Sequence, residues 1–103
     1  MTNITYTRTN ERFHLTAQGH AGYGPKGTDI VCAAVSIILQ SVAEYALESN
    51  VLEVVNLKLQ EGDGDIDIRG ESECFDMALI GLEMIAETYP ENVQMAEIKA
   101  LSR

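Results

Sequence analysis

The apolar segment between Ile30 and Leu47 is the feature that most constrains how this chain folds. Its apolar side chains recur at helical spacing and cover most of a helix circumference: Ile30, Val31, Ala33, Ala34, Val35, Ile37, Ile38, Leu39, Val42, Ala43, Ala46 and Leu47. A helix that is apolar nearly all round is expected to lie buried in the centre of a fold. Thr28 and Asp29 offer an N-cap, so we expect a helix over about residues 29–49. A chain of 103 residues has room for one such core, and we expect a single domain over residues 1–103.

Alternation of apolar and polar residues predicts strands on both sides of this helix. Residues 2–8 and 12–18 alternate and are expected to pair as a hairpin. Residues 54–60 and 65–69 are expected to form a second hairpin around a turn at residues 62–64. The inward side chains of the strand at 54–60 are expected to be Val55, Leu57 and Leu59.

A second helix is expected over residues 73–88, because one apolar face runs along it and Pro90 ends it. Residues 93–101 are expected to form a last strand. The element order is then strand, strand, helix, strand, strand, helix, strand. This order predicts an α/β fold of the α+β type, with a small, mostly antiparallel sheet packed with two helices.

Charge limits the partners of the chain. The net charge is −9, which argues against direct binding of nucleic acid or of an anionic membrane and permits a basic partner. Residues 1–43 are nearly neutral, at +1, whereas residues 44–103 carry −10. The N-terminus has no signal pattern, the apolar stretch 30–39 is too short to span a bilayer, and two cysteines are too few for a disulfide scaffold. We therefore expect a cytoplasmic protein.

The sequence matches several cofactor and metal motifs only in part. Gly22, Gly24 and Gly27 match the spacing of the dinucleotide fingerprint, but a hairpin precedes them instead of a βαβ unit. The aspartates of residues 63–67 resemble the start of a calcium loop, yet the required Gly and Glu positions are not met. The two histidines and two cysteines lack zinc spacing. We expect no cofactor and no metal.

A different set of residues around the glycine loop has the parts of a cysteine hydrolase. Cys32 falls in the first turn of the long helix, where the helix dipole favours a thiolate. His20 lies twelve residues upstream, and Asp29 and Ser36 share the helix face of Cys32. Backbone N–H groups of residues 31–33 are the expected oxyanion donors. The alternative is a buried small thiol, a loop histidine and an aspartate that only caps the helix.

The block Gly19-His20-Ala21, Gly24, Gly27 and residues 29–36 (Asp-Ile-Val-Cys-Ala-Ala-Val-Ser) resembles the signature of Prp, the bacterial ribosomal-processing cysteine protease family. The resemblance implies a cytoplasmic homodimer that removes a short N-terminal extension from a large-ribosomal-subunit protein precursor. It also implies that His20 and Cys32 are the catalytic pair and that Asp29 and Ser36 line the site, Asp29 being a candidate third member. Cleavage would follow a bulky aromatic residue and leave a basic N-terminus.

Other features carry open alternatives. Gly22, Tyr23, Gly24 and Gly27 form either a flexible substrate loop with Tyr23 as a lid or an ordinary tight loop. A stripe on the second helix, Met77, Ile80 and Met84, is either a dimer contact or part of a wide core face. Competing functions are a non-catalytic acidic module that binds a basic ribosomal protein, a thiol redox sensor using Cys32, and a small-molecule enzyme of acylphosphatase-like size.

Overall fold

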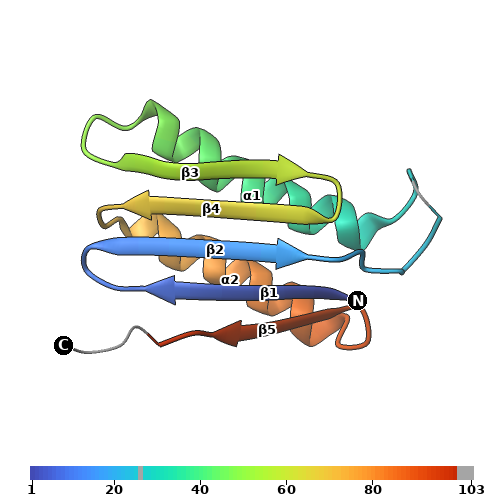
Figure 1. Ribbon diagram of the computed structural model, residues 1–103. Helices are drawn as coiled ribbons and strands as arrows, with labels where there is room; N and C mark the ends of the chain where they lie inside the picture. Colours follow the sequence, from blue (N-terminus) through green and yellow to red (C-terminus); the bar gives the residue numbers. More distant parts are fainter. Residues whose placement is uncertain (26, 100–103) are drawn as a thin grey trace.

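The alternating and helical segments become five strands and two helices in the computed structural model, which describes residues 1–25 and 27–99 (Figure 1). The elements follow the expected order: β1 (Thr2–Arg8), β2 (Arg12–Gln18), α1 (Ile30–Glu48), β3 (Glu53–Gln60), β4 (Asp63–Arg69), α2 (Glu73–Thr88) and β5 (Val93–Glu97). The last strand was expected to reach residue 101. It ends at Glu97, and residues 100 and 101 lie outside the described residues.

The strands form one sheet in the order β3-β4-β2-β1-β5. All neighbouring strands are antiparallel except β1 and β5, which run parallel because α2 carries the chain back across the sheet. Both helices cover the same face of the sheet and lie side by side (Figure 1). The predicted α+β fold is confirmed: two layers, one of strands and one of helices.

The core lies between the two layers. Phe13, Leu15, Ile66 and Ile68 of β2 and β4 are fully buried beneath the helices. Phe75 of α2 stacks on Phe13 with ring centroids 4.4 Å apart. Burying a large apolar side chain contributes about 1.5–3 kcal/mol to folding. These residues therefore fix both helices over the centre of the sheet, and the apolar face expected for α2 is buried there through Phe75, Leu79 and Leu82.

The position of α1 differs from the sequence expectation. In a two-layer fold the outer side of a helix has no third layer to cover it, so α1 is buried on one side only. Ile30, Ile37 and Leu47 are more than half exposed, although the helix is apolar nearly all round. The whole of α1 is also long and apolar enough to cross a membrane, so the length argument made from residues 30–39 was wrong. Core helices pass the same test, and the inner side of α1 packs on the sheet.

The start of β3 departs by one residue from the predicted alternation of the second hairpin. A bulge between Val54 and Asn56 places Val54 opposite the buried Ile68 and leaves Val55 48% exposed. Leu57 and Leu59 do face the helix layer, but they remain partly exposed because β3 is an edge strand. The turn is formed by Glu61 and Gly62, and residues 63 and 64 already belong to β4.

The opposite face of the sheet is polar. The aspartates considered for calcium each hold a basic side chain there: Lys58 with Asp63, His14 with Asp65 and Arg12 with Asp67. Hydrogen bonding to Arg12 lowers the pKa of the buried Asp67 carboxyl below its ordinary value of 3.8. These carboxylates are therefore engaged in cross-strand pairs that stabilise the sheet.

Candidate active site

Asp29 joins the glycine loop to the start of α1. One carboxylate oxygen, Oδ1, accepts hydrogen bonds from the backbone N–H groups of Val31 and Cys32, each at 3.0 Å. The other, Oδ2, accepts from the N–H groups of Tyr23 at 2.9 Å and Gly24 at 3.3 Å. These donors, led by the Cys32 N–H, lower the pKa of the Asp29 carboxyl below its ordinary value of 3.8. The predicted helix cap is confirmed, and the cap also fixes the loop.

The same bonds overturn the expected oxyanion donors. The N–H groups of Val31 and Cys32 are directed at the Asp29 carboxylate, and the N–H of Ala33 donates to the Asp29 carbonyl at 3.1 Å. Within residues 1–25 and 27–99, moreover, no hydrogen bond joins Asp29 to His20. Asp29 therefore acts on the backbone around Cys32 and not on the imidazole.

His20 follows the end of β2 and lies against the turn between β3 and β4. The N–H of Gly19 donates to the carbonyl of Gly62 at 2.9 Å, which ties the two segments together. A Cβ on Gly62 would lie only 2.7 Å from His20 Nε2, and Gly62 has a φ of +71°. Gly62 is thus required both by the turn and by the close approach of the imidazole.

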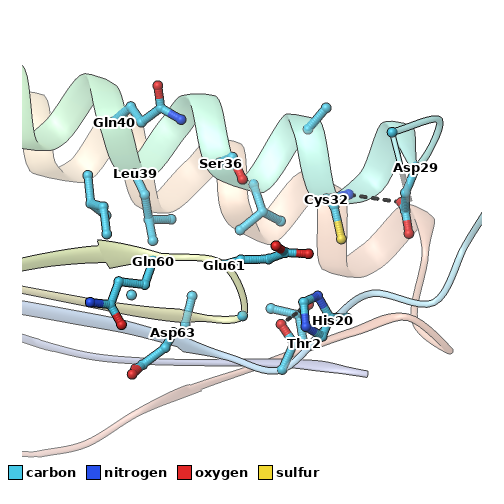
Figure 2. A pocket seen from close by; sticks show the side chains of 18 of the residues that line it. Thr2, His20, Asp29, Cys32, Ser36, Leu39, Gln40, Gln60, Glu61 and Asp63 are labelled. Carbon is cyan, nitrogen blue, oxygen red and sulfur yellow. Dashed lines mark hydrogen bonds between the residues drawn. The ribbon is translucent and has the colours of Figure 1, made fainter. Parts of the chain in front are cut away.

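A pocket of about 720 Å³ opens between α1 and the β3–β4 turn. Its volume falls within the range of small-molecule and peptide side-chain sites. Figure 2 shows the Cys32 sulfur pointing from α1 toward the strands, with the His20 ring below it. The lining includes most of the predicted site residues: His20, Gly24, Gly27, Asp29, Cys32 and Ser36.

The thiol and the imidazole share this pocket without a direct bond. The described part of the chain contains no hydrogen bond between the His20 ring and Cys32 Sγ, an arrangement common in catalytic pairs before substrate binds. The Cys32 thiol instead accepts a hydrogen bond from the backbone N–H of Ala21 at 3.4 Å. The pocket therefore holds a nucleophile and a proton-transfer group, and the buried backbone N–H of Ala21 contacts the sulfur from behind the pocket lining.

Tyr23 does not lie over the pocket. Its ring packs edge-to-face on Tyr89 at the end of α2, with the centroids 5.2 Å apart, and the side chain is 50% exposed. Of the described residues that line the pocket, none is Tyr23 or Gly22. In this conformation the aromatic side chain of the loop contacts α2 and leaves the mouth of the pocket open.

The β3–β4 turn contributes residues that the sequence reasoning missed. Glu61, Gly62 and Asp63 all line the pocket, and Figure 2 shows the Glu61 carboxylate extending between His20 and α1. The residues expected at the site, from His20 to Ser36, all fall in the nearly neutral segment 1–43, whereas the pocket also includes residues of the acidic segment 44–103. The pairing of Gln18 with Asp63 brings this turn beside His20. That register could be found only once β4 was known to neighbour β2.

Comparison with known proteins places this geometry in context. Residues 1–94 match the family model described as "Cysteine protease Prp". Over 90 residues the chain is 32% identical to the ribosomal processing cysteine protease Prp of Mycoplasma genitalium, covering 81% of this chain and 86% of that protein.

Two crystal structures of an essential ribosomal processing protease Prp from S. aureus are similar over 95% of this chain and 100% of theirs. The one with a covalently linked product peptide gives a TM-score of 0.77 at 22% identity. The one with a substrate peptide gives a TM-score of 0.69 at 21% identity. At these identities the structural likeness shows a shared fold.

Proposed function

The chain belongs to the Prp family of cysteine proteases, and on that premise we propose that it removes the N-terminal extension from the precursor of a large-ribosomal-subunit protein. In this proposal Cys32 is the nucleophile, and His20 is the general base and then the general acid. The observation that carries the proposal is the convergence of Cys32 and His20, from α1 and the end of β2, on one open pocket.

The reaction follows from these two groups. His20 takes the proton of the Cys32 thiol, and the sulfur attacks the carbonyl carbon of the scissile peptide bond. The tetrahedral intermediate collapses as His20 donates that proton to the leaving amine, which releases the mature protein. The extension remains on Cys32 as a thioester. Water then attacks this thioester with His20 as base, which frees the extension as a carboxylate and restores the thiol.

Asp29 and Ser36 support this chemistry in different ways. Asp29 holds the Cys32 backbone and the loop residues Tyr23 and Gly24, so it fixes where the thiol lies. Ser36 lies one helical turn beyond Cys32 on the pocket wall, where its hydroxyl can hydrogen-bond to a bound peptide. The Glu61 carboxylate extends into the pocket, which favours a basic segment of the substrate over an acidic one.

The test is incubation with a precursor that carries its N-terminal extension, followed by mass measurement of both products. We expect one cut in the wild-type reaction, none with Cys32→Ala, and a rate about 10²–10⁴-fold lower with His20→Ala. Cys74→Ala is the matched control, because Cys74 is an exposed free thiol at the start of α2. Its replacement should leave the cleavage rate unchanged. Processing by Cys32→Ala at the wild-type rate would show that the assignment is wrong.

We further propose that the protein is a homodimer. The stripe formed by Met77, Ile80 and Met84 is exposed by 74%, 57% and 62%, so it is not part of a wide core face. Three large apolar side chains along one helix face are typical of an interaction surface. A second copy of the chain is the partner that we propose for this stripe, through a two-fold contact.

The cytoplasm is the compartment that we propose for this activity. Cys32 and Cys74 are both free, as suits a reducing environment in which a catalytic thiol persists. A precursor of a ribosomal protein is also made there, so enzyme and substrate would meet without transport.

A further inference from the structure

The donors that stabilise an oxyanion in this site must be sought away from the first turn of α1, because Asp29 engages the N–H groups of Val31, Cys32 and Ala33. The backbone N–H of Ala21 differs from all three, since it is directed at Cys32 Sγ from 3.4 Å. We propose that the Ala21 N–H is the oxyanion donor of this enzyme and that the side chain of Asn92 positions it. This inference rests on the proposed role of Cys32 as nucleophile.

The backbone is held on both sides of this N–H. The nitrogen of Met1 donates to the His20 carbonyl at 2.5 Å. Because a trans peptide is planar, the Ala21 N–H then points the opposite way, toward Cys32. The next carbonyl, that of Ala21, accepts a hydrogen bond from Asn92 Nδ2 at 2.9 Å. The donor is therefore fixed before any substrate arrives.

Asn92 is itself fixed to two elements. Its N–H donates to the Tyr89 carbonyl at 3.0 Å, and its carbonyl accepts from the Thr2 N–H at 2.9 Å. The Ala21 side chain is 2% exposed, so the segment that Asn92 orients cannot shift without disturbing the core. Asn92 thus links the end of α2, β1 and the loop that carries His20. It acts through Ala21 and does not line the pocket, which makes it a positioning residue.

The chemistry gives this N–H two successive partners. In the resting enzyme it donates to the Cys32 sulfur. When sulfur bonds to the scissile carbonyl carbon, negative charge moves to the carbonyl oxygen, which is bonded to the same carbon as Sγ. Because the donor is fixed and already directed at Sγ, the bound substrate can bring that oxygen within its reach without any movement of the loop. Fixed donors of this kind contribute about 10²–10³-fold to kcat.

The direct test replaces Ala21 by L-lactic acid in a fully synthetic chain, which exchanges the N–H for an ester oxygen and keeps the methyl group. We expect kcat to fall about 10²-fold or more with KM changed less than threefold, because the donor acts mainly on the transition state. A peptide aldehyde, which forms a tetrahedral adduct with the thiol, should lose affinity by a similar factor. An ester chain that folds normally and keeps kcat within twofold would overturn the proposal.

The second variant is Asn92→Asp, which keeps the side-chain shape but removes the donor to the Ala21 carbonyl. We expect kcat to fall about tenfold at unchanged KM, whereas a purely structural role would lower thermal stability and leave kcat of the folded protein intact. Asn50→Asp, in an exposed turn, adds the same charge and should have no effect. An Asn92→Asp variant that keeps the wild-type kcat would show that Asn92 does not position the Ala21 N–H.

Alkylation of Cys32 by iodoacetamide at pH 7 separates this proposal from the proposed function. The ester chain should be alkylated several-fold more slowly than the wild-type chain, whether or not any precursor is cut, because it lacks the donor to the thiolate. Equal alkylation rates would contradict the Ala21 contact. A wild-type chain that cleaves no precursor would instead contradict the proposed substrate. The difference in alkylation rate between the two chains would still test the role of the Ala21 N–H.

Discussion

Replacing Gly62 with alanine should inactivate the enzyme by displacing His20. The new Cβ would lie 2.7 Å from His20 Nε2 and 3.0 Å from Cε1. Since unstrained contacts of this kind need about 3.5 Å, the imidazole must move by roughly 0.8 Å. A displacement of about 1 Å in a catalytic group costs about 10²-fold in rate. Alanine at a φ of +71° also costs about 1–2 kcal/mol of stability.

Gly70→Ala is the matched control for this change. Gly70 has a φ of +128°, and its Cβ would lie 2.7 Å from Leu52 Cδ2, at the other end of β4. Both variants should unfold at lower urea concentration than the wild-type protein, but only Gly62→Ala should lose kcat in the precursor cleavage assay. The reasoning is refuted if folded Gly62→Ala keeps kcat within twofold, or if Gly70→Ala loses as much.

Three further outcomes follow. Arg12→Met should lower the free energy of unfolding at pH 7 by about 1–3 kcal/mol, because Asp67 stays buried without its partner. In the wild-type protein Asp67 stabilises the fold above its ordinary pKa of 3.8, and this stabilisation is lost as the pH falls through the lower pKa of the folded state. Urea unfolding should therefore show that the free energy of unfolding falls less between pH 7 and pH 3 in Arg12→Met than in the wild-type protein. An equal fall in the two proteins would contradict this. Ile80→Glu should give a monomer by sedimentation at micromolar concentration whereas Val51→Glu, at an 85% exposed site, stays dimeric. Added salt should lower kcat/KM for a basic precursor, and a rate independent of salt would leave the acidic surface with a role in solubility alone.

The sequence predicts the elements well because their patterns are local. Alternation, helical spacing and the Asp29 cap depend on neighbouring residues, and most of the expected elements reappear in the structure with bounds shifted by a residue or two. Two strands differ more: β5 ends at Glu97 and not at residue 101, and in β3 a bulge moves Val55 off the expected face. A bulge depends on the partner strand, which local alternation does not contain.

The site is predicted only in part, because its residues come from distant segments. His20, Cys32 and Asp29 lie close in sequence around one loop, so their convergence could be expected. Gly62 and Asn92 could not, since they reach the loop only through the strand order and the path of the chain after α2. Asp29 shows a further limit: its residue type fits both a triad and a cap, and only the hydrogen bonds distinguish them.

Intact-mass measurement of a rapidly quenched reaction tests the central claim most directly. Mixed with the extended precursor, the enzyme should gain the mass of the extension as a thioester, and peptide mapping should place it on Cys32. The adduct should persist in Cys74→Ala and be absent from Cys32→Ala. Cleavage in the absence of any adduct on Cys32, or an adduct on Cys74, would contradict the account.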